Sequence, residues 1–88
     1  MLTFKRSDQT VTAEKYTGRN GPRIIQWAAG AIREVPKVGK EQIHLVVETP
    51  SGPVKATIGD WIIKGVAGDF STCNPDDFGQ LYEEELPF

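Results

Sequence analysis

Residues 41–58 read EQIHLVVETPSGPVKATI and contain the clearest structural pattern of the chain. Ile43, Leu45 and Val47 alternate with more polar neighbours, which predicts a strand over 41–49 with one apolar face. The segment at 50–53 predicts a tight reversal, because Gly52 tolerates positive φ and proline fixes its own φ. Residues 54–58 should then return antiparallel, so the stretch predicts a β-hairpin.

Downstream of the hairpin, turn residues separate short β-prone segments. We expect strands at 61–64 and 70–73, a turn at 59–60 and a loop at 65–69. Asn74 is placed to cap a helical turn that begins at Pro75, with Phe78 pointing inward. Leu81 and Tyr82 could close the sheet as a last short strand. The acidic tail, about 83–88, is expected to be solvated.

Upstream, the pattern predicts a strand over 11–16, a loop over 17–22 and a helix that starts at Pro22. Ile24, Trp27, Ala28 and Ala31 fall on one face of that helix, and Gly30 marks its end. Residues 32–40 are the least regular part, with a short strand expected at 33–35.

The 88 residues, 39% hydrophobic and 25% charged, fit one domain covering 1–88. We predict an α+β fold in which a small antiparallel β-sheet, or a partly open barrel, packs against one main α-helix. A domain this small buries a modest share of its surface, so a homo-oligomer would gain stability.

The charge balance argues against several partners. A net charge of −2 disfavours a nucleic-acid polymer, because such a polymer attracts a sustained basic surface. The first eight residues hold no apolar stretch long enough for a signal peptide or membrane span, so we expect a cytoplasmic protein without a membrane partner.

Catalytic and metal chemistry lack a convincing residue set. His44 stands alone on the less apolar strand face and is expected at the surface, and one Cys and one His cannot build a zinc site. Cys73 precedes a short helix but lacks an adjacent base, so we expect a small core residue. Asp76 and Asp77 have ordinary capping roles. We therefore predict no enzyme, no cofactor and no metal.

The most suggestive ligand pattern is Gly18-Arg19-Asn20-Gly21-Pro22-Arg23 at the predicted helix start. Unpaired backbone N–H groups, close approach at glycine and two arginines would suit a phosphate. The pattern lacks the Gly-Lys-Ser/Thr ending of a P-loop and the three-glycine dinucleotide spacing. An ordinary helix start with exposed arginines remains an alternative.

Three further residues could complete a nucleotide site. Trp61 or Tyr16 could stack on a base, although core packing is the usual role of aromatic residues in so small a chain. Lys64, beside Gly65, could reach a phosphate, or it could be a lysine that protects a strand edge.

The segment GDWIIKGVAGDF at 59–70, followed by Cys73, Pro75, Asp77-Phe78 and Tyr82-Glu83, resembles a family of small uncharacterised bacteriophage proteins. Residues 12–18 and the helix with Trp27 match that family more loosely. Ser71 and Thr72 depart from its pattern, since the relatives carry an aromatic residue and a proline there.

The resemblance implies a phage accessory protein in the bacterial cytoplasm. Such proteins often block a host protein or sequester a nucleotide-derived signal of an antiviral system. We therefore expect a non-enzymatic protein that binds and sequesters a small anionic nucleotide, with a pocket that can lie between protomers. The alternative is a protein-interaction module that inhibits a host protein or is a minor structural component of the phage.

Overall fold

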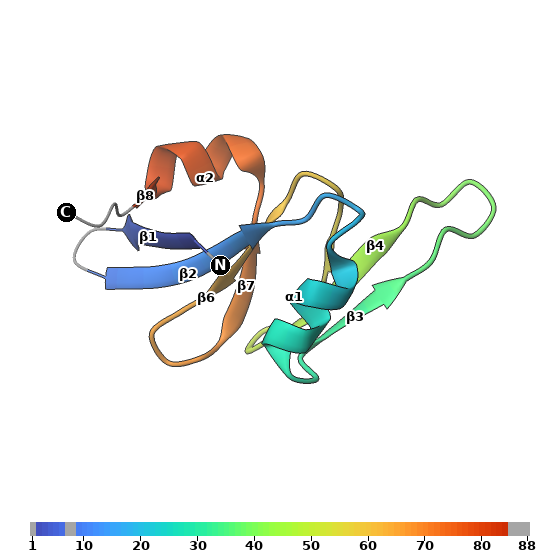
Figure 1. The fold of residues 1–88 in the computed structure, drawn as a ribbon, viewed down its shortest axis with the longest axis horizontal. Helices are drawn as coiled ribbons and strands as arrows, with labels where there is room; N and C mark the ends of the chain where they lie inside the picture. The colour runs from blue at the N-terminus through green and yellow to red at the C-terminus, as the bar shows by residue number, and fades with distance from the viewer. Residues whose placement is uncertain (1, 7–8, 85–88) are drawn as a thin grey trace.

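The computed structural model describes residues 2–6 and 9–84, which form two antiparallel sheets and two helices (Figure 1). The five-stranded sheet has the order β7-β6-β2-β1-β8, and the three-stranded sheet has the order β3-β4-β5. Within the described residues the sheets do not close into a barrel. The elements are β1 (Leu2–Arg6), β2 (Gln9–Lys15), α1 (Gly21–Ala28), β3 (Ile32–Val35), β4 (His44–Thr49), β5 (Gly52–Ala56), β6 (Trp61–Lys64), β7 (Phe70–Cys73), α2 (Pro75–Leu81) and β8 (Glu83–Glu84).

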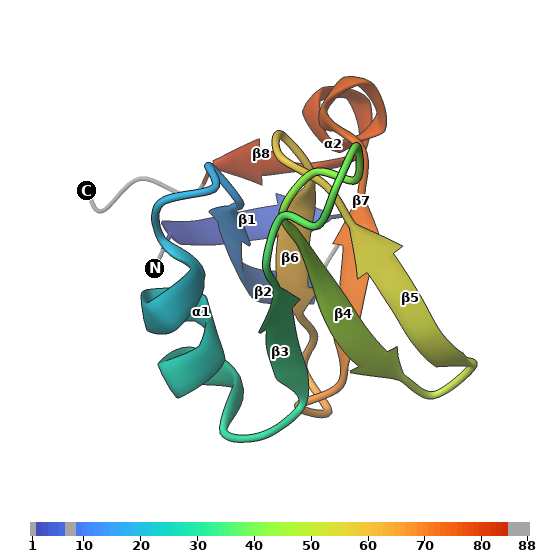
Figure 2. The ribbon, with the colours of Figure 1, turned by 90° about the vertical axis from the view of Figure 1, so that its right-hand side faces the viewer.

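One face of the five-stranded sheet packs on α1 and on the three-stranded sheet (Figure 2). Ile62 of β6 and Phe70 of β7 meet Ile24 of α1 and Leu45 of β4 in this first core cluster. Trp27, partly buried, packs against it as the helical pattern predicted. The first cluster therefore joins the two sheets directly and also holds α1.

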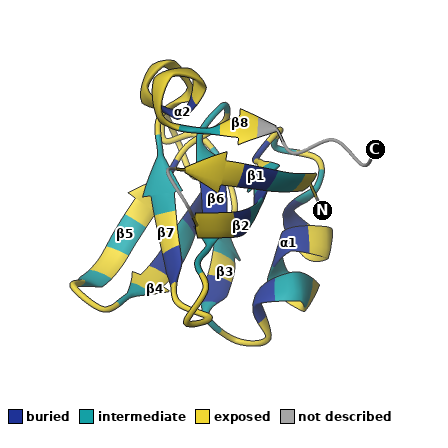
Figure 3. Ribbon diagram, turned by 90° about the vertical axis from the view of Figure 1, so that its left-hand side faces the viewer, coloured by how far each residue is buried: buried dark blue, intermediate teal, exposed yellow. Residues whose placement is uncertain are grey.

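The opposite face of the same sheet carries a second core cluster under α2. Ile63, the neighbour of Ile62, lies in this cluster with Phe4, Ala13 and Phe78. Adjacent residues of a strand point to opposite faces, so β6 supplies one residue to each core. The buried positions along β6 are dark blue in Figure 3.

The predicted hairpin is confirmed. β4 pairs with β5 in a register that places Val47 opposite Val54 and Thr49 opposite Gly52. Gly52 has a φ of 110°, which glycine adopts without strain. The short strand expected at 33–35 also exists as β3, and α1 ends where Ala29 and Gly30 adopt left-handed conformations.

The two ends of the chain differ from the prediction. β1 was not predicted, because its charged residues conceal a strand that pairs with β2 and buries Phe4. The helical turn at Pro75 extends into the seven-residue α2, so Leu81 and Tyr82 do not form a strand. Instead Glu83 and Glu84 pair with β1 as β8, and only residues 85–88 of the expected tail lie outside the described part.

His44 is buried, so its prediction as a surface residue was wrong. Its ring lies at the start of β4, where Nδ1 is 3.1 Å from the carbonyl oxygen of Gln42. A carbonyl only accepts, so Nδ1 carries the proton in this contact. The hydrogen bond satisfies one ring nitrogen. The alternating pattern over 41–49 placed His44 on the less apolar face and did not indicate that its ring is buried.

Two truncations in α2 should lower the stability of the protein by unequal amounts, because Phe78 is buried in the second core and Leu81 is exposed. Phe78→Ala should lower the free energy of unfolding by about 3–5 kcal/mol, because it removes a buried ring that touches Phe4, Trp61 and Tyr82. Leu81→Ala is the control, since Leu81 is 43% exposed on the same helix. Urea unfolding measures both, and equal losses would contradict the second core.

Candidate functional site

The loop before α1 is held by its own side chains. The Asn20 amide oxygen accepts hydrogen bonds from the Thr17 backbone N–H at 2.9 Å and the Thr17 hydroxyl at 3.1 Å. The Asn20 amide nitrogen donates to the Lys15 carbonyl at 2.8 Å. These bonds engage both ends of the Asn20 amide, so its side chain fixes the loop.

The start of α1 is already covered by an internal anion. An added Cβ at Gly21 would overlap the Glu34 carboxylate, which reaches the helix from β3. The Tyr16 hydroxyl donates to the same carboxylate at 2.7 Å. A negative group is favourable near a helix N-terminus. The Glu34 carboxylate therefore lies where the predicted phosphate at Gly21 would bind, which argues against a second anion there.

Arg23 lies in the first turn of α1 and pairs with Glu14 of β2, with 2.9 Å between guanidinium nitrogen and carboxylate oxygen. The Arg23 side chain is 63% exposed, whereas the Glu14 side chain is 12% exposed. Glu14 Oε2 is buried without a hydrogen-bond partner among the described residues. A guanidinium has five N–H donors, so Arg23 keeps donors for a further anion.

Both aromatic residues predicted to stack on a base pack in a core cluster. Tyr16 is fully buried in the first core cluster, so its ring offers no face to a ligand. Trp61 is partly buried and packs parallel to Phe78, with ring centroids 4.0 Å apart, and edge-on to Phe4 at 5.3 Å. The stacking role of Trp61 stays a prediction.

Lys64 and Trp61 are three residues apart on β6 and point to opposite faces of the sheet. Lys64 lies over the Phe70 ring at 5.8 Å on the α1 side. Trp27 of α1 meets the same ring edge-on at 5.2 Å. Of the predicted cations, Arg23 of α1 and Lys64 of β6 both lie on the α1 side of the sheet, and Phe70 contacts both Lys64 and Trp27.

We call this arrangement of Arg23, Trp27 and Lys64 the α1–β6 surface. Lys64 pairs with Thr12, and Ile62 pairs with Glu14, so Lys64 lies diagonally across from Glu14 on the same sheet face. Sequence reasoning considered Trp27 for stacking but did not choose it among the site residues, although its spacing of four from Arg23 indicates one helical face. Arg19 is exposed in the loop before α1.

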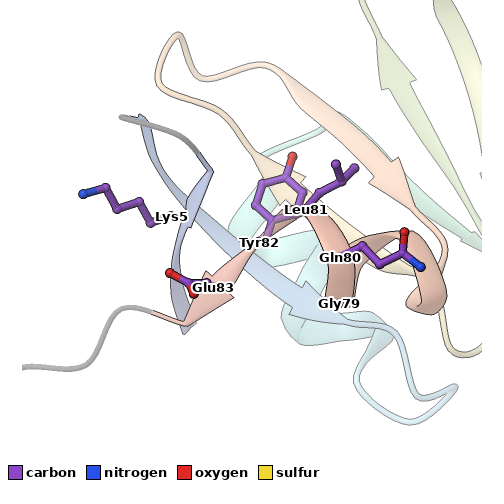
Figure 4. A pocket seen from close by; sticks show the side chains of 6 residues that line it. All are labelled: Lys5, Gly79, Gln80, Leu81, Tyr82 and Glu83. Atoms are coloured by element: carbon purple, nitrogen blue, oxygen red, sulfur yellow. The ribbon is translucent and has the colours of Figure 1, made fainter.

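A first open cavity of about 480 Å³ lies between β1 and the end of α2 (Figure 4). Lys5, Gln80, Tyr82 and Glu83 line it, and the side chains of Lys5 and Tyr82 point away from each other. Arg6 covers the Tyr82 ring at 5.7 Å. The polar groups that line this cavity do not converge on one point, so the cavity is a poor ligand site.

A second open cavity of about 490 Å³ lies at the C-terminal end of α1. Ala28 and Ala31, the turn at 48–50 and the segment at 68–70 line it. We call it the α1-end cleft. It combines an apolar lining with the carboxylates of Glu48 and Asp69.

Two observations concern the thiol of Cys73 and metal-ligating side chains. Burial raises the pKa of the Cys73 thiol, and the charge of Asp77 raises it further, so this thiol is a poor nucleophile at neutral pH. Within residues 2–6 and 9–84, no three His, Cys, Asp or Glu side chains are grouped to hold a metal ion. No helix in that part is long and apolar enough to cross a membrane.

Comparison with known protein families, with curated proteins and with solved structures finds no match to this chain. The resemblance to a phage family therefore stays a prediction. The site must be argued from the geometry of its own residues.

The contact between Tyr16 and Glu34 predicts a loss of stability in alkaline solution. Burial, then the hydrogen bond to Glu34 and its charge, raise the pKa of Tyr16 above its usual value of 10.0. Below that pH the contribution of Tyr16 to stability is complete. Above it the unfolded chain releases the proton while the folded protein keeps it, so stability falls by up to about 1.4 kcal/mol per pH unit.

Urea unfolding of the wild type and of Tyr16→Phe, at about pH 8 and about pH 11, measures this effect. The wild type should lose more stability between the two pH values than the variant does. An equal loss in the two proteins would show that Tyr16 is not responsible.

Proposed function

We propose that this protein is a non-enzymatic binding protein that holds and sequesters a small nucleotide-like anion on the α1–β6 surface. The observation that carries the proposal is the shared face of two cations and a partly buried indole: Arg23, Lys64 and Trp27. The proposal keeps the ligand class expected from the sequence and replaces Trp61 and Tyr16 by Trp27 as the aromatic contact.

The cations suit a phosphorylated ligand. Glu14 holds the Arg23 guanidinium at a fixed place over β2, which lowers the entropy cost of binding an anion. Lys64 lies diagonally across from Glu14 and adds a second positive charge. One carboxylate between two cations leaves a net positive surface on an acidic protein, which suits a small anion better than a long polyanion.

The aromatic part suits a planar group. Trp27 is partly buried on α1, four residues after Arg23, and the edge-on contact with Phe70 fixes its indole. A ring so fixed can stack on a base at little cost in side-chain entropy. A nucleotide whose phosphate binds Arg23 and Lys64 and whose base stacks on Trp27 would lie along α1.

The surface is open, so retention of a ligand calls for a second covering group. We propose that a second protomer covers it, which agrees with the stability that so small a domain would gain by self-association. The proposal includes action in the host bacterial cytoplasm as a phage accessory protein.

Native mass spectrometry with a panel of cyclic oligonucleotides and ADP-ribose derivatives tests the proposal. We expect one ligand to be retained by the folded protein and released unchanged by heat. The variant Arg23→Gln/Lys64→Gln should bind it at least about tenfold more weakly, because two charge-assisted contacts are lost. Glutamine can still donate to Glu14, so the fold should persist.

The matched control is Arg33→Gln/Lys37→Gln, which removes the same charge from exposed positions away from the surface. It should retain wild-type affinity. Equal weakening in the two variants would assign the effect to overall charge and contradict the proposed surface.

The second candidate function is a protein-interaction module that inhibits a host protein or is a minor structural component of the phage. The α1-end cleft favours it, because the cleft is open and lies at the opposite end of α1 from the predicted phosphate loop. A defined host protein that stays bound after small molecules are removed, with no ligand retained from the panel, would support this candidate over the first.

A further inference from the structure

Asn20 and Gly21 form the only Asn-Gly step of the sequence, which contains two asparagines. In such a step the backbone nitrogen of the glycine can attack the side-chain carbonyl carbon of the asparagine, because glycine has no Cβ to hinder the approach. The other asparagine, Asn74, precedes Pro75, whose backbone nitrogen carries no hydrogen. Asn20 is therefore the one asparagine of the chain that can close a ring in this way.

The reaction has two steps and needs only water from the solvent. The Gly21 nitrogen loses its proton and bonds to Cγ of Asn20, and the side-chain nitrogen takes up a proton and leaves as ammonia, which yields a cyclic imide. Water then adds to one of the two imide carbonyl carbons and breaks its bond to the ring nitrogen. The product carries a carboxyl group in place of the amide, either as aspartate or as isoaspartate, in which the backbone runs through Cγ.

The backbone at the start of α1 holds the reacting atoms apart. A ψ of 18° at Asn20 places the Gly21 nitrogen nearly in line with the backbone nitrogen of Asn20 about the Cα–C bond. Ring closure needs the Gly21 nitrogen in line with Cβ instead. The Asn20 carbonyl accepts the Ile24 N–H at 3.1 Å, so the rotation that brings the two atoms together would break the first hydrogen bond of α1.

The side chain of Asn20 is held as well. Its amide nitrogen donates to the Lys15 carbonyl at 2.8 Å, and its amide oxygen accepts from the N–H and the hydroxyl of Thr17. Lys15 and Thr17 are exposed, and hydrogen bonds at an exposed loop open by local fluctuation at a small free-energy cost. The reaction therefore requires this loop to open but does not require the protein to unfold.

The product cannot restore the loop. A carboxylate only accepts hydrogen bonds, so it cannot donate to the Lys15 carbonyl, and its oxygen would face the carbonyl oxygen without a proton between them. The isoaspartate form also adds a carbon atom to the backbone between residues 20 and 21. Conversion is therefore a one-way change in the loop before α1.

We propose that Asn20 is a site of spontaneous deamidation, which the hydrogen bonds of Asn20 to Lys15 and Thr17 restrain in the folded protein. Its conversion releases the loop from Lys15. The inference goes beyond the proposed nucleotide function and does not rest on it, since it concerns the covalent chemistry of the loop and not the binding of a ligand.

Peptide mapping by mass spectrometry tests the proposal on the full chain, incubated in mildly alkaline buffer with and without urea. Asn20 should gain the mass of an amide that has become an acid, and Asn74 should remain an amide. The folded wild type should convert at least about tenfold more slowly than the unfolded chain, because several hydrogen bonds must open first. No conversion of Asn20 in urea, or equal rates in the two conditions, would overturn the proposal.

Thr17→Val tests the restraint, because it removes the hydroxyl that Asn20 accepts from and keeps the shape of the side chain. The folded variant should convert about threefold faster than the wild type. Thr72→Val makes the same change in β7 and should convert at the wild-type rate. Equal rates in the two variants would overturn the role of the Thr17 contact.

Asn20→Asp carries the aspartate product from the start and tests the release of the loop. Its urea midpoint should lie below that of the wild type, because the bond to Lys15 is lost. A midpoint equal to or above the wild-type value would overturn the release.

Discussion

The alternation of side chains along β6 is the constraint on which the rest of this structure depends. Ile62 faces α1 and the three-stranded sheet, and Ile63 faces α2. Because the strand is buried on both faces, a shift of one residue in its register would exchange the two cores. The same alternation sends Trp61 to one core and Lys64 to the other side of the sheet. A site that needs both residues cannot form on one face.

Two carboxylates of the chain itself, those of Glu34 and Glu14, limit the binding of an anion at the start of α1. Glu34 lies at the N-terminus of α1, and Glu14 pairs with Arg23, so two of the groups expected to attract an anion already have a partner within the chain. The two cases differ in exposure. The buried contact of Glu34 with Tyr16 is structural, whereas Arg23 reaches solvent with donors to spare. The candidate site therefore moves from the loop to the outer face of the helix.

The sequence predicted the hairpin, α1 and the strands β6 and β7 because their patterns are local. Gly52 and the β-branched residues around it act within a few positions. The sequence did not predict β1, because that strand becomes apparent only from its pairing with β2. The sequence also did not predict the burial of His44. The cation pair Arg23 and Lys64 was predicted, but its grouping with Trp27 was not. That grouping depends on the register of β2 with β6 and on the direction of α1, and neither is encoded in residue spacing.

The two tryptophans lie on opposite faces of the sheet, which allows one direct test of the central claim. Trp61→Phe leaves Trp27 as the sole tryptophan, and Trp27→Phe leaves Trp61. Tryptophan fluorescence is followed in both variants during titration with the nucleotide that the wild type retains. The account predicts a saturable change from Trp27 and none from Trp61. A change confined to Trp61, or no change in either variant while the nucleotide remains bound, would contradict binding on the α1–β6 surface.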